Sequence, residues 1–313
     1  VGKLTDQAIL AKIALSTNDT DVRYVAIEKI TDQTLLAEIA LGMNYEEASR
    51  AAVEKLTDQT ALAKIAINSQ HSKARRTAQD KITDEALLTK IAINSKDLNA
   101  RIAAQNKITD ETLLAKIAIE VRNANMCYAA VQKITDQALL AEIAKNPIIL
   151  DDPRLCKEVV GKLTDQAIPA KIALSTKNTD VRYVAIEKIT DQALLAEIAT
   201  NPIILDDPRL CKEVVGKLTD QAILAKIALS TKDTGVFVVA IEKITDQALL
   251  TEIALTAKDS WFGCAAVKKI TDQTLLAKIV LKSHDESLRR SAIRKITDPG
   301  IKEKLKQLKP ELG

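Results

Sequence analysis

The sequence predicts an all-α protein: a right-handed α-solenoid of about eleven two-helix repeats of 26–29 residues, closed by a C-terminal capping helix. The first observation is a Thr-Asp pair that recurs every 26 residues, apart from two gaps of 29 residues. The second is that apolar residues make up 47% of the chain but aromatic residues only 2%, so Ala, Leu and Ile must build the core. A period of this length is typical of stacked units that cannot bury their apolar faces alone.

Residues 4–29 show how one repeat is built. Thr5 is the expected N-cap of a first helix, with Asp6 at the positive end of the helix dipole. Apolar residues then follow at helical spacing over about three turns, namely Ile9, Leu10, Ile13, Ala14 and Leu15. Residues 16–21 are polar and predict a turn. A short second helix follows, closed by Lys29 at its negative end, with these residues facing inward: Val22, Val25, Ala26 and Ile27.

The array is expected to span residues 1–295 as one domain, and 296–313 the cap, whose amphipathic helix covers Ile301 to Leu308. Residues 146–200 and 201–255 are near-duplicate blocks, and each opens with a segment, 146–153 or 201–208, that accounts for three added residues. We expect this segment to bulge along one edge, with Asp152 as N-cap and Pro153 as first residue of a second helix. Pro169 falls inside a first helix and predicts a kink or a delayed start.

A resemblance to known repeat families rests on the pattern D-x-x-V-R-x-x-A before a Leu-rich helix. It reads Asp-Thr-Asp-Val-Arg-Tyr-Val-Ala at 19–26 and Asn-Thr-Asp-Val-Arg-Tyr-Val-Ala at 178–185. This resembles the HEAT-like and leucine-rich-repeat-variant families of α-solenoids, and the resemblance covers nearly the whole chain. It implies an α-solenoid that binds proteins or, in some members, nucleic acids. The iron–sulfur module beside some leucine-rich-repeat-variant arrays would need clustered cysteines, which the sequence lacks, so no cofactor is expected.

Composition argues against several functions. The 45 basic and 42 acidic residues nearly balance, which is unlike a basic nucleic-acid clamp. The four cysteines form no C-x-x-C pair, which favours a reducing compartment and a cytoplasmic location. His71 and His284 lie far apart in a linear stack, and glycine-rich phosphate loops are absent, so we expect neither an enzyme nor a metal site. No apolar run is long enough to span a membrane, and a monomer is expected.

The candidate binding residues come from comparing the chain with itself. The two near-duplicate blocks differ at seven positions, and four of these lie in the turn and first turn of one second helix. Every aromatic residue also lies in this stretch of its repeat. One interpretation is a constant scaffold with a variable binding surface; the others are drift on an exposed strip, or burial against the next repeat. The candidates for contacting a partner are Arg23, Tyr24, Arg50, Arg75, Arg76, Arg101, Tyr128, Arg182, Tyr183, Phe237, Trp261, Phe262, Arg289 and Arg290.

These residues predict a non-enzymatic scaffold that binds a protein or peptide. The alternatives are a nucleic-acid-binding solenoid and a structural spacer. For nucleic acid, a Lys precedes every apolar-Thr-Asp, as Lys29 does, and such lysines could track phosphates. However, each is followed three residues later by Asp, as Lys29 is by Asp32, and helix-end electrostatics explains both rows. Clustering of the arginines on one surface would favour nucleic acid; an apolar strip with Tyr183, Phe237, Trp261 and Phe262 would favour protein.

Overall fold

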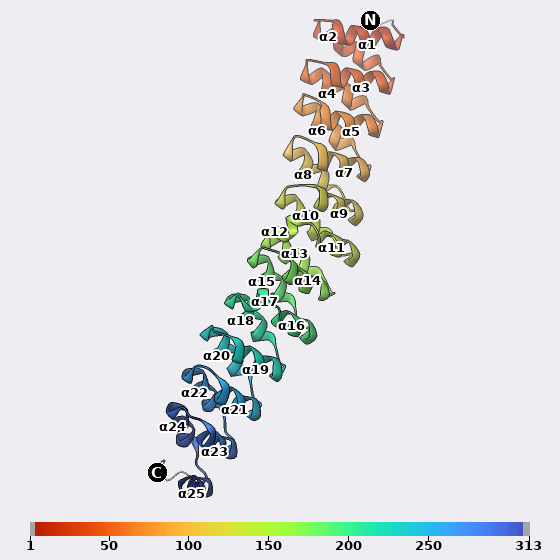
Figure 1. Ribbon diagram of the computed structural model, residues 1–313. Coiled ribbons are helices and arrows are strands. Elements are labelled where there is room, and N and C mark those ends of the chain that lie inside the picture. Colours follow the sequence, from red (N-terminus) through yellow and green to blue (C-terminus); the bar gives the residue numbers. More distant parts are fainter. Residues whose placement is uncertain (1–3, 309–313) are drawn as a thin grey trace. The chain divides into compact units, whose positions relative to one another are not determined.

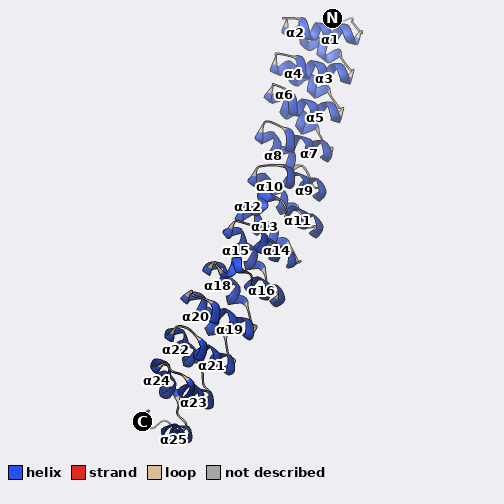
Figure 2. Cartoon of the chain, in the orientation of Figure 1, coloured by secondary structure: helices blue, strands red, loops and turns tan. Residues whose placement is uncertain are grey.

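The computed structural model describes residues 4–308, and within this range the chain forms 25 α-helices and no strand (Figures 1 and 2). First and second helices alternate along the chain and are joined by short turns. This confirms the predicted all-α repeat of helix pairs. The chain divides into two compact bodies, an N-terminal body of Val1–Ile149 and a C-terminal body of Leu150–Gly313, which are described separately.

In the N-terminal body, the first helices pack side by side in one layer and the second helices in another (Figure 1). The first helices are α1 (Gln7–Ser16), α3 (Gln33–Gly42), α5 (Gln59–Asn68), α7 (Glu85–Asn94), α9 (Glu111–Glu120) and α11 (Gln137–Ile143). The second helices are α2 (Thr20–Lys29), α4 (Glu46–Lys55), α6 (Ser72–Lys81), α8 (Leu98–Asn106) and α10 (Ala124–Lys133). The short helix α12 (Pro147–Asp151) contains the division between the bodies.

The C-terminal body has the same two layers (Figure 1). Its first helices are α14 (Ala167–Ser175), α16 (Gln192–Ala199), α19 (Gln221–Ser230), α21 (Gln247–Thr256) and α23 (Gln273–Lys282). Its second helices are α13 (Pro153–Lys162), α15 (Thr179–Lys188), α18 (Pro208–Lys217), α20 (Thr234–Lys243), α22 (Ser260–Lys269) and α24 (Glu286–Lys295). A short helix, α17 (Pro202–Leu205), packs against α16 and α18, and α25 (Pro299–Leu308) packs against α23.

The first helices other than α14 are capped by Asp, which corrects the prediction that Thr is the N-cap. Asp6 is the N-cap of α1, and its carboxylate accepts a hydrogen bond from the Ile9 N–H at 3.0 Å. The preceding Thr serves the neighbouring repeat instead. The Thr31 N–H donates to the Gln7 side-chain oxygen at 2.8 Å, and the Asp32 N–H donates to the same oxygen at 3.2 Å. The first residue of α1 therefore ties its repeat to the next one, as Gln33 of α3 and Gln221 of α19 also do.

Two first helices of the N-terminal body carry Glu at this place. The Glu85 carboxylate accepts from the Thr109 hydroxyl at 2.7 Å and from the Asp110 N–H at 2.8 Å. These bonds, that of the Thr109 hydroxyl above all, lower the Glu85 pKa below its ordinary value of 4.5. Because the folded pKa is depressed, the stabilisation is complete above pH 4.5 and disappears as the pH falls through the folded value.

The variant Glu85→Gln should therefore lose less stability in acid than the parent protein. Gln occupies this place in α3 and α5, where it accepts from the backbone N–H of the Thr in the next repeat, so the urea midpoint at pH 7 should change little. Below about pH 4.5 the midpoint of the parent should fall further than that of the variant, because Gln has no proton to take up. Equal pH dependence of the two midpoints would contradict this assignment.

The conserved spacing of Lys at the end of each second helix also joins repeats. The Lys55 ammonium donates to the Ile27 carbonyl at 3.2 Å, and that of Lys107 donates to the Gln79 carbonyl at 2.9 Å. In the C-terminal body, Lys217 reaches the Ile186 carbonyl at 2.9 Å. The helix-end interpretation is thus confirmed for these lysines, with one correction: each of them serves the C-terminus of the preceding second helix as well as closing its own.

The core lies between the two layers, with Leu10, Ala26 and Ile27 at most 1% exposed. Val25 was expected to face inward but is 38% exposed, and Ile9 and Leu15 of the apolar pattern in the first helix are each 47% exposed. Leu15 lies in the last turn of its helix. The equivalent Ile119, Leu229 and Leu281 are also exposed, so this position is an edge rather than core.

The added segments and Pro169 have simple structural outcomes. The expected bulge in the second block is the helix α17, while Asp152 and Pro153 do begin α13 as predicted. α14 begins at Ala167, one residue later than its copy α19. In that copy, the Leu224 N–H donates the first helical bond, to the Asp220 carbonyl. Pro169 has no N–H to make this bond, so the helix starts later, as one of the two expectations had it.

The C-terminal helix is confirmed over Pro299–Leu308, with Leu305 buried against the array. The rest of the predicted cap, residues 309–313, lies outside the described part of the chain.

Candidate functional site

The structure sorts the variable residues of the second helices into two groups. We number the positions of each second helix from its first residue, so that Thr20 is position 1 of α2. Residues at positions 2 and 5 form an outer row, whose side chains are exposed or half-buried. In the N-terminal body the outer row consists of Asp21, Tyr24, Glu47, Arg50, Lys73, Arg76, Asn99, Ile102, Asn125 and Tyr128. In the C-terminal body it consists of Arg154, Lys157, Asp180, Tyr183, Arg209, Lys212, Gly235, Val238, Trp261, Cys264, Ser287 and Arg290.

Position 4 points the other way, toward the C-terminal carbonyls of the first helix in the same repeat. The Ser49 hydroxyl donates to the Ala40 carbonyl at 2.5 Å, Arg101 Nε to the Ala92 carbonyl at 2.8 Å, and the Cys127 thiol lies 3.4 Å from the Ala118 carbonyl. These carbonyls end a helix and have no backbone partner further along it. The side chain at position 4 is thus an internal cap.

Six of the candidate partner-binding residues occupy position 4, where the side chain points inward. They are Arg23, Arg75, Arg101, Arg182, Phe237 and Arg289. Arg23 is 2% exposed and donates to the Thr17 carbonyl, while its guanidinium lies 3.8 Å from the centre of the Tyr45 ring. Arg289 donates to the Ser283 carbonyl at 3.1 Å. Arg75 and Arg101 donate to carbonyls at the end of the first helix in the same way, Arg182 is half-buried, and Phe237 is fully buried.

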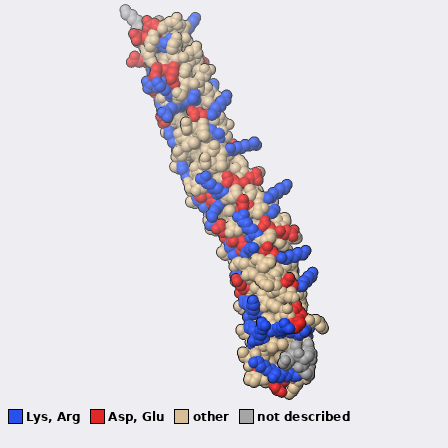
Figure 3. Space-filling view, turned by 90° about the vertical axis from the view of Figure 1, so that its left-hand side faces the viewer, with Lys and Arg blue, Asp and Glu red and all other residues tan. Residues whose placement is uncertain are grey.

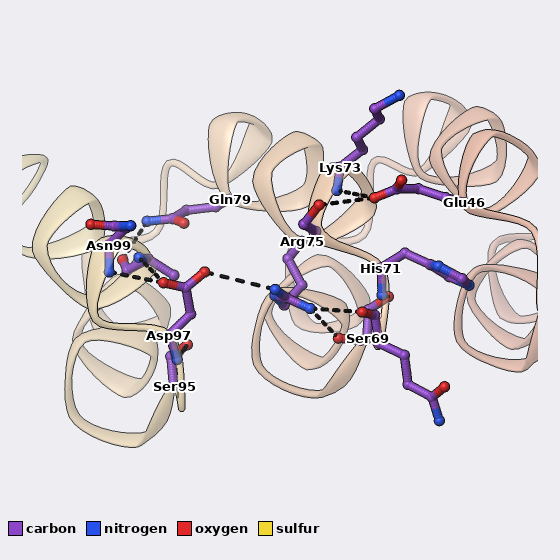
Figure 4. A network of polar contacts seen from close by, with 12 residues as sticks. Glu46, Ser69, His71, Lys73, Arg75, Gln79, Ser95, Asp97 and Asn99 are labelled. Carbon is purple, nitrogen blue, oxygen red and sulfur yellow. Dashed lines mark hydrogen bonds and ion pairs between the residues drawn. The ribbon is translucent and has the colours of Figure 1, made fainter.

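Arg75 shows how position 4 joins two repeats (Figure 4). Its guanidinium donates to the Ser69 carbonyl at 2.9 Å and lies 3.7 Å from the Asp97 carboxylate of the next repeat. On the other side of α6, the Glu46 carboxylate accepts from the Ser72 hydroxyl and the Lys73 N–H, at 2.9 and 3.0 Å. These bonds lower the Glu46 pKa, with the Lys73 N–H as the largest cause.

A cavity of about 370 Å³ lies between α6 and α8, beside this network. Its lining combines three basic with two acidic side chains, so it has little net charge. Gln79 lies in its wall and donates across it to the Ala100 carbonyl at 2.7 Å (Figure 4). The lining consists of Ser72, Lys73, Arg75, Arg76, Gln79, Asp80, Asp97, Asn99, Ala100 and Ala103.

Seven of the candidates lie in the outer row, where a partner could reach them: Tyr24, Arg50, Arg76, Tyr128, Tyr183, Trp261 and Arg290. Several of their charges are already paired. Arg50 lies between Glu47 at 3.0 Å and Glu54 at 2.6 Å, and Arg290 is paired with Glu286. Basic and acidic side chains are intermixed on the face over the second helices (Figure 3). The arginines therefore do not form the uncompensated positive surface that nucleic-acid binding would need.

Around Tyr183 the outer row forms a polar contact between neighbouring repeats. Arg209 pairs with Asp180 at 2.7 Å and its guanidinium lies 4.5 Å from the centre of the Tyr183 ring. The Tyr183 hydroxyl donates to the Glu213 carboxylate at 3.1 Å, which raises the Tyr183 pKa. A shallow cavity of about 720 Å³ opens here, lined by Tyr183, Asp207, Pro208, Arg209, Lys212 and Glu213.

Three aromatic residues meet between α20 and α22. The rings of Phe237 and Phe262 are stacked, with centroids 4.0 Å apart and planes 4° apart. Trp261 contacts both rings, with its centroid 6.0 Å from Phe237 and 5.5 Å from Phe262. Phe237 is fully buried and Phe262 half-buried, whereas Trp261 is 51% exposed. Of the apolar strip that would favour a protein partner, three members therefore come together, as a buried and a half-buried Phe that support one exposed indole, while Tyr183 lies in the polar contact described above.

Sequence reasoning missed the residues that hold the repeats together. Gln105, which is 2% exposed, donates to the Met126 carbonyl at 2.8 Å in the next second helix, as Gln79 does to Ala100. A Gln among the apolar residues of these two helices was a visible signal. For position 4, the signal was spacing: Arg23 precedes Ala26 and Ile27 by three and four residues, which places it on their buried side.

The fold and these contacts define an all-α tandem-repeat protein. No protein-family model matches the chain, and no curated protein matches it. Among solved structures, one described as computational design of self-assembling cyclic protein homooligomers is 13% identical, over 95% of this chain and 92% of that chain, with a TM-score of 0.12. A TM-score this low is no evidence that the two proteins are related. Among the described helices, none has the length and apolar character needed to cross a lipid bilayer.

Proposed function

We propose that this protein is a non-enzymatic scaffold that binds a protein or peptide along the outer row of its second helices. The observation that carries this proposal is Trp261, an indole half exposed to solvent while two packed Phe rings hold it in place. A large aromatic side chain that is already ordered loses little conformational entropy on binding, which is why such residues dominate many interfaces.

The contrast between the two layers supports a binding role. First helices repeat nearly the same residues, whereas the outer row offers aromatic, basic, acidic and amide side chains in turn. A relation to HEAT-like or leucine-rich-repeat-variant proteins, which the sequence pattern suggests, fits this division of labour. The lysines at the helix ends donate to backbone carbonyls, which favours a protein partner over a nucleic acid.

Selection from a peptide display library, followed by titration of the selected peptides, tests this proposal. Trp261 is the sole tryptophan, so its emission reports binding at the outer row directly. In Trp261→Ala, followed by calorimetry, affinity should fall by about 30-fold or more, the effect of losing a central aromatic anchor. Ile203→Ala is the matched control: this side chain is 42% exposed but lies on α17, away from the row.

Selected peptides that bind Trp261→Ala as tightly as the parent would contradict this proposal. Tight binding of single-stranded or duplex nucleic acid, lost steeply as salt rises, would do so too.

We further propose that the scaffold works as a monomer in a reducing compartment such as the cytoplasm. All four cysteines are present as thiols, and Cys127, Cys156 and Cys211 are buried. Burial raises the pKa of the Cys156 and Cys211 thiols to about 11, so both remain protonated at neutral pH.

A further inference from the structure

The outer row of the C-terminal body contains one place where a polar contact has been exchanged for an apolar surface. We call it the Trp261 patch, formed by Gly235 and Val238 on α20 and Trp261 on α22. We infer that the Trp261 patch and the neighbouring Lys212 bind a peptide segment in which a large apolar side chain lies next to a carboxylate. This inference rests on the proposed function and specifies the partner chemistry at one site.

The near-duplicate blocks show what the patch replaces. In the first block, Asp180 pairs with Arg209 of the next repeat, and Arg209 also covers the Tyr183 ring. In the second block, Gly235 stands for Asp180 and Val238 for Tyr183. In the repeat after the second block, Trp261 occupies the outer-row position that Arg209 has after the first. An ion pair with its cation–π contact is thus exchanged for glycine, valine and an indole.

The exchange reaches into the core below. Phe237 stands where the first block has Arg182, and it stacks on Phe262. A buried ring at this position lets Trp261 rest on an aromatic base rather than on a guanidinium. The substitutions at the surface and beneath it therefore serve the same end, an apolar support for a half-exposed indole.

Lys212 supplies the charge. Its ammonium lies over Gly235, so close that a Cβ built on this glycine would overlap it. In the first block, the counterpart Lys157 reaches instead to Glu187 at 3.4 Å, and the place over the backbone belongs to the Asp180 side chain. Gly235 therefore removes a carboxylate of the chain and leaves an ammonium in its place.

The existing partner of Lys212 does not satisfy it. Asp233 lies 3.5 Å from the ammonium, but its carboxylate caps α20 by accepting from the Val236 N–H at 2.8 Å. An ammonium has three N–H donors, and the Lys212 side chain is 42% exposed. A carboxylate from outside can therefore bind it, while an adjoining apolar side chain covers the indole and Val238.

The probe for this site is the capped peptide acetyl-Gly-Leu-Asp-Gly-amide, titrated into the full chain while Trp261 emission is followed. We expect a saturable blue shift, because the Leu side chain removes water from the indole. Peptides with Asn for Asp, or Gly for Leu, should each bind about tenfold more weakly, since each lacks one of the two contacts.

The decisive variant is Gly235→Asp, which restores the residue of the first block and is compatible with the fold there. Its carboxylate should pair with the Lys212 ammonium and lower the affinity of the Leu-Asp probe peptide by about tenfold. Ser287→Asp adds the same charge to the outer row of the repeat after Trp261 and should leave affinity unchanged.

Equal affinity of Gly235→Asp and the parent chain, or equal affinity of the Asp and Asn peptides, would overturn the inference. If the probe does not bind but display-selected peptides still depend on Trp261, the inference fails and the proposed function stands. If no selected peptide depends on Trp261, both fail.

Discussion

Replacing Phe237 by Ala should destabilise the C-terminal body by about 3–5 kcal/mol, the range found when a buried Phe is truncated. The side chain is fully buried, and its ring stacks on Phe262 at 4.0 Å. Truncation removes this contact and leaves a cavity between α20 and α22 that the fixed helix ends cannot close. Urea unfolding followed by circular dichroism measures the loss, and a red shift of Trp261 emission should accompany it in the folded state.

Two comparisons separate the packing of Phe237 from a general sensitivity of this region. Phe237→Leu keeps most of the apolar volume and should cost less than half as much. Trp261→Ala removes a larger ring that is already half exposed, so its effect on stability should be smaller than that of Phe237→Ala. A loss below about 1 kcal/mol for Phe237→Ala would mean that the stacked pair does not hold these repeats together.

The internal cap at position 4 leads to a second large effect, expected for Ser49→Ala. The Ser49 hydroxyl is fully buried and donates to the Ala40 carbonyl at 2.5 Å. Without it, this carbonyl is left buried without its partner, which costs about 1–3 kcal/mol. The urea midpoint should fall, and amide hydrogen exchange should quicken first in α3 and α4, where the bond joins the two helices of one repeat.

Thr34→Ala is the matched control because it removes a hydroxyl from an exposed position of α3, where α1 and α7 carry Ala8 and Ala86. Its effect should stay within about 0.5 kcal/mol. If Ser49→Ala and Thr34→Ala prove equally harmless, the cap at position 4 has no energetic role.

Most of the fold could be predicted from the sequence because its determinants are local. Asp-led helix starts, apolar residues at helical spacing and Pro169 each act within a few residues, and the predicted helix pairs are found. The partners of helix-end groups could not be predicted, because they depend on how one repeat is offset against the next. Lys55 reaching the Ile27 carbonyl and Gln7 accepting from the Thr31 N–H are examples.

The sequence predicted which segment of each repeat contains the candidate site, but not which side chains of that segment are exposed. The variable first turn of the second helices does contain the outer row, including Tyr183 and Trp261. Within that turn, Arg23 and Phe237 face inward while Tyr24 and Val238 do not, a distinction of one residue that corresponds to about 100° around the helix axis. The differences between the two blocks therefore include both outer-row residues and the inward-facing residue that packs beneath them.

The Gln and Lys contacts between repeats have a consequence for how such a gene can change. Wherever these contacts are seen, a Gln accepts from the Thr N–H of the next repeat, and a Lys donates to a carbonyl at the end of the preceding second helix. A recombination event that copies whole repeats in frame therefore creates new joints of a kind already present. Residues 146–200 and 201–255 have the form that such an event leaves behind. The two copies can then diverge at their binding residues while the joints between repeats stay the same.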